Sequence, residues 1–165
     1  MPTGKAKAPL FEEHTAAVFE RIFNPHCIDK PRMQVTSPAP NHRRDIILPI
    51  VANGGVWHYW AVVHGSDLIM VECKNYAGPI GQDEVESTVK YLRRPGLSRL
   101  AFIVSRKGPD TSAIQAAREI YRTEPTKLLV FLSEQDLIDL LRFTGKHDAA
   151  SLHLRRICQE YQLKY

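Results

Sequence analysis

The sequence predicts an α/β protein in which helices flank a mixed β-sheet. Its 165 residues are enough for one compact domain with a sizeable core, and its content of 44% hydrophobic and 24% charged residues is ordinary for a globular protein. Two short runs, 100–105 and 127–132, are almost wholly apolar, as strands buried on both faces are. Helical patterns alternate with these two strands, and such alternation is typical of α/β folds.

The N-terminal part of the chain is predicted to contain a tail and a helix. Residues 1–9 carry positive charge without an apolar core, so we expect a flexible tail in front of a single domain over 10–165. A helix is predicted over 10–23, and Pro25 ends it. The apolar residues on one face of this helix are Phe11, Val18, Phe19 and Ile22.

Strands are predicted to follow as a hairpin or meander. A short strand is expected at 33–36, and the apolar runs within 45–51 and 68–75 predict two more. Residues 57–63 are rich in aromatic and β-branched side chains, so a further strand or wall is expected there. Aromatic residues within this last segment are predicted to belong to the core, with base stacking as the alternative.

The second half is predicted to alternate helices with the two apolar strands. Helices are expected at 82–92, 110–123 and 137–143, and a last helix at 151–163. Ser133 precedes the third of these helices with the spacing of a capping box, which fixes where that helix begins. The complete order is therefore a helix, a group of strands, and then helix–strand–helix–strand–helix.

Bulk composition narrows the class of function. The net charge of +4 favours a polyanionic partner. The three cysteines, Cys27, Cys73 and Cys158, are far apart, which argues against a disulfide framework or a zinc ribbon and fits a reducing cytoplasm. No apolar stretch approaches the roughly 20 residues needed to span a bilayer, so no membrane segment is expected.

The most informative feature is an acid and a base at the end of an apolar strand. Glu72 and Lys74 follow the run 68–71, and strand alternation points both to one face and Cys73 to the other. A buried carboxylate and a buried ammonium each need a partner, and a divalent cation and a phosphate would supply both. Asp45 enters the preceding apolar strand. Together these residues indicate a metal-dependent nuclease; a simple ion pair at a sheet edge is the alternative.

This constellation resembles the PD-(D/E)xK nuclease superfamily. The run 71–76, Val-Glu-Cys-Lys-Asn-Tyr, is similar to the motif of its Mrr-like branch, and the likeness extends over 10–141 in element order. The resemblance implies a restriction-endonuclease-like sandwich. The chain departs from the pattern in two places. Arg44 replaces the proline before the aspartate, and Ser87 stands where some Mrr-like members carry a glutamine four residues before Tyr91.

The resemblance also implies a metal site. Asp45 and Glu72 would bind Mg²⁺ or Mn²⁺, which prefer oxygen ligands and keep several waters. The backbone carbonyl of Cys73 would be a further ligand, whereas its thiol would face the core. Glu12 matches an acid that relatives place near the metal, and its neighbour Glu13 is the alternative.

Catalysis and DNA contact follow from the same resemblance. Lys74 would lie beside the attacking water, help to deprotonate it and stabilise charge on the phosphate. Further contacts to nucleic acid are expected from one group of polar and basic side chains: His42, Arg43, Arg44, Asn75 and Arg106.

The expected activity is hydrolysis of DNA phosphodiester bonds by a cytoplasmic, Mg²⁺- or Mn²⁺-dependent endonuclease. The chain has no recognisable reading head, so little sequence specificity is expected. A homodimer or a protein partner would supply recognition or activation, and the resemblance implies a role such as bacterial defence. Two alternatives stay open: a non-catalytic nucleic-acid-binding or assembly module with the same fold, and an RNA-cleaving member of it.

Overall fold

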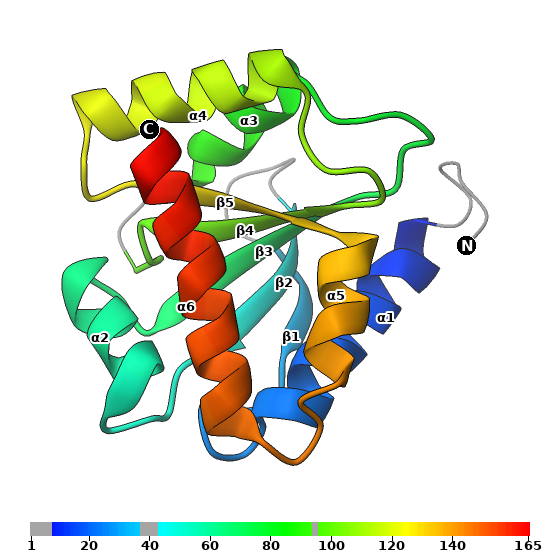
Figure 1. Cartoon of the computed structure of the whole chain (residues 1–165), viewed down its shortest axis with the longest axis vertical. Coiled ribbons are helices and arrows are strands. Elements are labelled where there is room, and N and C mark those ends of the chain that lie inside the picture. Colours follow the sequence, from blue (N-terminus) through cyan, green and yellow to red (C-terminus); the bar gives the residue numbers. More distant parts are fainter. Residues whose placement is uncertain (1–7, 37–42, 94–95) are drawn as a thin grey trace.

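The core of the structure is a five-stranded mixed β-sheet, with its strands in chain order (Figure 1). The strands are β1 (Arg32–Thr36), β2 (Arg43–Pro49), β3 (Leu68–Lys74), β4 (Leu100–Ser105) and β5 (Leu128–Ser133). The pairs β1–β2 and β2–β3 are antiparallel, whereas the pairs β3–β4 and β4–β5 are parallel. This computed structural model describes residues 8–36, 43–93 and 96–165.

Helices cover both faces of the sheet. The described helices are α1 (Ala8–Phe23), α2 (Gly55–Val63), α3 (Gln82–Val89), α4 (Thr111–Thr123), α5 (Glu134–Leu141) and α6 (His147–Lys164), with a 3-10 turn η2 (Tyr91–Arg93). Helices α1, α2, α5 and α6 pack on one face, and α3 and α4 pack on the other (Figure 1). The predicted α/β class, with a mixed sheet between helices, is confirmed. None of the described helices is both long and apolar enough to cross a membrane.

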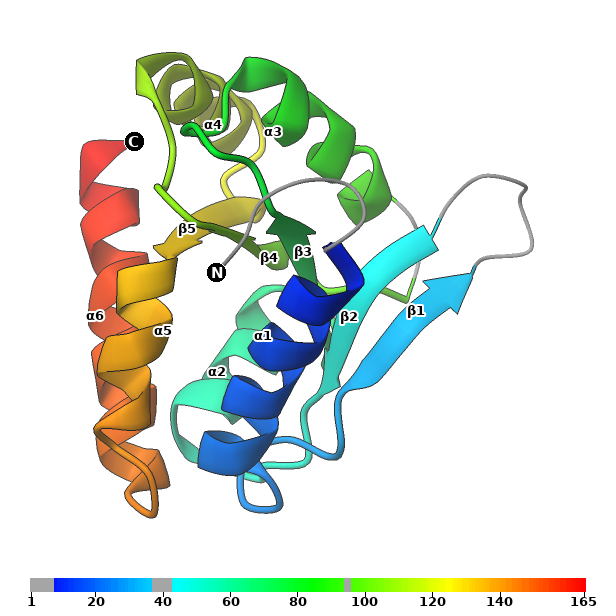
Figure 2. The same ribbon diagram turned by 90° about the vertical axis from the view of Figure 1, so that its right-hand side faces the viewer.

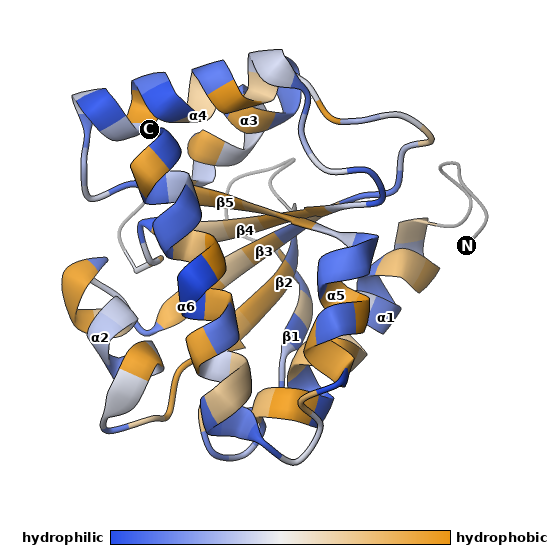
Figure 3. Ribbon diagram, in the orientation of Figure 1, coloured by the Kyte–Doolittle hydropathy of each residue, from blue (hydrophilic) through white to orange (hydrophobic). Residues whose placement is uncertain are grey.

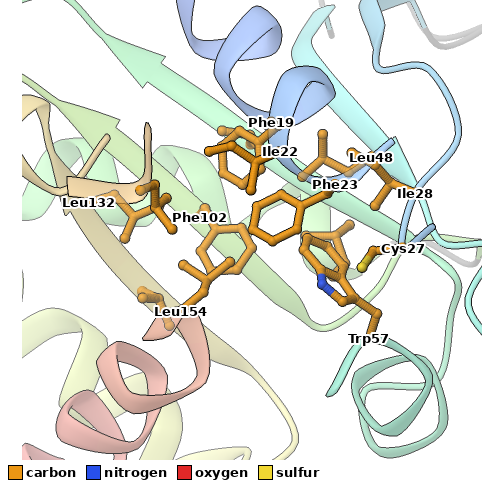
Figure 4. Close-up of a cluster of buried hydrophobic side chains, with 14 of the residues drawn as sticks. Phe19, Ile22, Phe23, Cys27, Ile28, Leu48, Trp57, Phe102, Leu132 and Leu154 are labelled. Atoms are coloured by element: carbon orange, nitrogen blue, oxygen red, sulfur yellow. The ribbon is translucent and has the colours of Figure 1, made fainter. Parts of the chain in front are cut away.

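The larger of the two cores is aromatic. It lies between the sheet and the helices α1, α2, α5 and α6. There Phe23 packs edge-on against Trp57 with ring centroids 4.9 Å apart, and Phe19 stacks on Phe102 with ring centroids 6.0 Å apart (Figure 4). Figure 3 shows strands that are mainly hydrophobic and helices that carry both hydrophobic and hydrophilic residues. Because burying such rings removes much apolar surface from water, this core holds α1 against the sheet.

Strand β4 is covered on both faces of the sheet. All six of its residues are buried, with Phe102 and Val104 in the aromatic core and Ala101 and Ile103 in the smaller core under α3 and α4. The prediction that 100–105 is buried on both faces is confirmed. Because both of its faces are packed, β4 also holds its paired neighbours β3 and β5 in the interior.

The strand predicted at 57–63 is wrong, because this segment is helix α2. The helix begins after Gly54, which adopts an extended conformation at the N-cap. Trp57 and Trp60 are buried three residues apart, whereas Tyr59 and Val62 between and beyond them are exposed. That period of about three to four belongs to a helix, and burial of two tryptophans outweighs the strand preference of the individual residues. The expectation that the aromatic residues are core is confirmed for the two tryptophans.

The other predicted helices are present with shifted ends: α5 begins three residues and α6 four residues before the predicted starts, and α3 ends three residues before the predicted end. The capping box at Ser133 is present, with the Ser133 backbone N–H donating to Asp136 Oδ2 at 2.7 Å, and α5 starts directly after it. Helix α1 begins at Ala8, so the predicted tail over 1–9 is two residues too long, and residues 1–7 lie outside the described part.

A hydroxyl on α6 ties α2 to the core. Trp57 Nε1 donates to Ser151 Oγ at 2.9 Å, and Ser151 Oγ donates to the carbonyl of His147 at 2.7 Å. We expect Ser151→Ala to lower the free energy of unfolding by about 1–3 kcal/mol, because it leaves the indole N–H buried without an acceptor. Urea unfolding followed by tryptophan fluorescence measures this loss. Thr123→Ala on exposed α4 is the control and should stay within about 0.5 kcal/mol of wild type; equal stability of the two variants would contradict the prediction.

Candidate functional site

The chemical groups singled out in the sequence meet at one edge of the sheet. Strand β2 runs antiparallel to β3 with Ile46 opposite Val71, and continuing this register places Asp45 opposite Glu72. Lys74 ends β3 and is in register with Ser105, which ends the parallel strand β4. The beginning of β2 therefore lies beside the carboxyl ends of β3 and β4. Ligands commonly bind outside the carboxyl ends of parallel strands in such sheets.

Asp45 and Glu72 form a close pair of carboxylates. Asp45 Oδ2 accepts a hydrogen bond of 2.8 Å from the backbone N–H of Cys73. The pKa of Asp45 is raised from 3.8 to about 7, chiefly by burial and next by the negative charge of Glu72, whereas the hydrogen bond from Cys73 opposes the rise. The ionised pair therefore lacks sufficient positive charge around it.

Lys74 is the positive group nearest to this pair. Its Nζ donates to Glu72 Oε1 at 2.8 Å, and the two side chains are only 15% and 8% exposed. Burial by itself lowers the pKa of Lys74, but the Glu72 carboxylate outweighs burial and raises that pKa above 10.5. Lys74 is therefore an ammonium at neutral pH. Glu72 Oε2 is buried and has no hydrogen-bond partner among the described residues.

The donor set fits a hard divalent cation. In the described part, no group of three or more His, Cys, Asp and Glu side chains is placed to hold a metal. Mg²⁺ nevertheless is usually bound by only one or two carboxylates and keeps several waters. Such a cation would stabilise the two facing carboxylates. The oxygen Oε2 of Glu72 has no hydrogen-bond partner among the described residues, and the pKa of Asp45 is raised.

Helix α1 brings a third acid to the same edge. The first turns of α1 lie beside the tip of β3 (Figure 2), and Glu12 is 6% exposed while Glu13 is exposed. The charge of Glu12 contributes to the raised pKa of Asp45, so it lies within electrostatic reach of the pair. Gln34 Nε2 donates to Glu12 Oε2 at 3.5 Å. Of the two acids left open by the sequence, the structure places Glu12 at the site.

Cys73 points away from the charged pair, as expected. Its thiol side packs against the aromatic core and hydrogen-bonds with Thr15 of α1. Burial raises the pKa of the Cys73 thiol well above its ordinary value, and the Asp45 charge adds to that rise. A neutral, core-facing thiol is a poor ligand for a hard cation, which leaves the backbone carbonyl as the group that Cys73 would contribute.

The residues predicted to contact nucleic acid differ in their burial and in their present partners. His42 lies outside the described residues, as does the side chain of Arg43. Arg44 is half-buried, and its Nε has no hydrogen-bond partner among the described residues. Asn75 is 7% exposed, and Arg106 pairs with Glu134 at 3.5 Å. Arg44 and Arg106 thus lie near the edge, and Arg106 would have to leave its partner to bind a phosphate.

Two further hydroxyl groups belong to this neighbourhood. Ser105 is 1% exposed, and its Oγ has no hydrogen-bond partner within the described structure. Burial raises the pKa of the Tyr91 phenol, and the charge of Glu72 adds to the rise, which places Tyr91 within reach of the carboxylates. The sequence analysis named neighbours of both residues, because Ser105 precedes Arg106 and Tyr91 lies four residues after Ser87. Gln34, in contrast, carries no sequence signal, because it lies in a proline-punctuated segment without a motif.

Comparison of the chain with models of protein families, with curated proteins and with solved structures finds no match. The likeness to PD-(D/E)xK nucleases therefore stays a prediction from the motif and the order of elements.

Proposed function

We propose that the chain is a divalent-metal-dependent nuclease of the restriction-endonuclease-like class that hydrolyses phosphodiester bonds in DNA. The observation that carries the proposal is the meeting of Asp45, Glu72 and Lys74 at one edge of the sheet, with two facing carboxylates and an ammonium within 2.8 Å of one of them. Such a group is costly to bury for structural purposes alone, because its negative charges are not fully compensated.

Each residue has a role in this proposal. Asp45 and Glu72 would hold Mg²⁺ or Mn²⁺, with the Cys73 carbonyl as a further ligand. The cation, when bound, supplies a water of lowered pKa and positive charge beside the scissile phosphate. Lys74 keeps its proton, so its ammonium is suited to donate a hydrogen bond to a phosphate oxygen in the transition state. Glu72 would exchange Lys74 for the cation, which frees the ammonium for the substrate.

The substrate is proposed to be DNA. The net charge of +4 favours a polyanion, and Arg44 has a guanidinium nitrogen without a partner among the described residues. A chain with one such site cuts one strand at a time, so a cut through both strands requires either a second nick by the same chain or a second chain. We therefore expect nicked circles to accumulate before linear plasmid.

Cleavage assays with matched variants test the proposal. Wild type, Glu72→Gln and the control Glu86→Gln on the exposed face of α3 are incubated with supercoiled plasmid, and in parallel with single-stranded DNA and RNA, in Mg²⁺, Mn²⁺ or EDTA. We expect cutting of DNA by wild type and Glu86→Gln, and none by Glu72→Gln or in EDTA. Cutting of RNA alone would overturn the choice of substrate. Binding of DNA without cutting in either metal would contradict a nuclease and favour the non-catalytic module.

A further inference from the structure

Gln34 has an unusual backbone for a residue in a strand. Its φ is +54°, and it is the one residue other than glycine with a positive φ in the described part of the chain. A left-handed conformation is unfavourable for a residue with a side chain, and glycine or asparagine adopts it more easily. Strain of this kind persists where the surroundings over-determine it, and it is concentrated at functional sites.

The strained residue lies directly beside the candidate site. Strand β1 pairs with β2 through Met33 opposite Ile46 and Val35 opposite Arg44, so Gln34 lies opposite Asp45. In a regular strand, the side chains of neighbouring residues alternate between the two faces. A local left-handed residue re-aims its side chain, as β-bulges next to active sites do. The amide of Gln34 thereby reaches across from β1 to α1.

The side chain that it reaches is the third acid of the site. Gln34 Nε2 donates to Glu12 Oε2 at 3.5 Å, and Glu12 is buried although it is a carboxylate on a helix. Had the chain needed only a kink in an edge strand, glycine would have supplied it without strain. The presence of a glutamine at this position is explained by the use of its amide.

We propose that Gln34 is a positioning residue, whose strained backbone directs its amide so that the Glu12 carboxylate is held toward the cation bound by Asp45 and Glu72. This inference rests on the proposed metal site. Glu12 then adds negative charge to the cation's surroundings, directly or through a bound water. Groups that orient the surroundings of metal ligands commonly change metal affinity by about 10- to 100-fold when they are removed.

Two substitutions separate the backbone from the amide. Gln34→Gly removes both the strain and the amide, whereas Gln34→Ala removes the amide and keeps the strain. The melting temperature of each purified protein is measured in EDTA, and its Mn²⁺ affinity is measured by titration without DNA. We expect Gln34→Gly to raise the melting temperature and both variants to bind Mn²⁺ about 10-fold more weakly than wild type. A variant that is more stable and yet binds metal less well is not expected of a residue with a purely structural role.

A double substitution tests the path through Glu12. Glu12→Gln alone should weaken Mn²⁺ binding, and adding Gln34→Gly to it should cause little further loss, because the two side chains act as one unit. Unchanged Mn²⁺ affinity in Gln34→Gly, with wild type still cutting DNA, would overturn the inference and leave the nuclease standing. Weaker Mn²⁺ binding by Gln34→Gly in a protein that cuts no DNA would support the inference and contradict the nuclease. A wild type that binds no Mn²⁺ overturns both.

Discussion

Lys74→Ala is expected to reduce metal-dependent cleavage of plasmid by about 10³-fold, because an ammonium aimed at the phosphate is worth that much in comparable sites. The same change should lower the stability of the metal-free protein, since it leaves Glu72 buried without the partner now 2.8 Å away. Divalent metal should restore part of that stability by taking the place of the lost positive charge. Cleavage rates, and melting temperatures with and without Mn²⁺, measure the two effects.

Two matched variants separate catalysis from folding. Lys74→Arg keeps the charge and the pairing with Glu72, so we expect near-wild-type stability with cleavage still strongly reduced, because a planar guanidinium does not replace a compact ammonium. Lys30→Ala removes an exposed lysine and should change neither property. Cleavage by Lys74→Ala at the wild-type rate would exclude Lys74 from the reaction and would point to a contaminating nuclease.

Asp45→Asn is expected to abolish cleavage and, unusually, to stabilise the metal-free protein at neutral pH. The pKa of Asp45 is raised from 3.8 to about 7, so between these values the folded state holds a proton that the unfolded state has lost. The contribution of this group to stability therefore falls as pH rises through that window and stays constant above it. Asparagine removes the charge and keeps an oxygen to accept from the Cys73 N–H. The gain has an upper limit of roughly 4 kcal/mol.

Urea unfolding in EDTA at about pH 5 and about pH 8 measures this gain, which should be larger at the higher pH. Mn²⁺ should raise the melting temperature of wild type and leave that of Asp45→Asn nearly unchanged, because the variant lacks a ligand. Asp67→Asn, an exposed acid near the other end of β3, is the control and should show neither behaviour. A stability difference that is the same at both pH values would contradict the raised pKa.

The sequence was informative wherever local pattern and tertiary packing agree. Short apolar runs such as 100–105 are buried strands because a strand covered on both faces places every side chain inside, and the Ser133 capping box fixes the start of α5 through bonds that are local in the chain. The grouping of Glu72 and Lys74 on one side of β3 followed from alternation alone. Their proximity to Asp45 followed from the expectation that the strands at 45–51 and 68–75 are neighbours in the sheet.

The remaining features depend on contacts that are distant in the sequence. Residues 57–63 have the composition of a strand, but Trp57 is held by Ser151 of α6, some 94 positions later, and the segment becomes a helix. Whether Glu12 or Glu13 lies at the site depends on which side of α1 packs against the sheet. The left-handed backbone of Gln34 depends on the pairing of β1 with β2 and on a partner in α1. No local pattern encodes any of these.

The placement of Glu12 on α1 has a consequence for motion. One side of this helix anchors it in the aromatic core through Phe19 and Phe23, and its first turns bring an acid to the edge where Asp45 and Glu72 meet. Any excursion that lifts α1 from the sheet would remove that acid, so occupancy of the site and docking of the helix are thermodynamically linked. Under the proposed function, a bound cation would therefore hold the N-terminal helix against the sheet. The amide hydrogens of α1 would then exchange with solvent more slowly when the cation is bound.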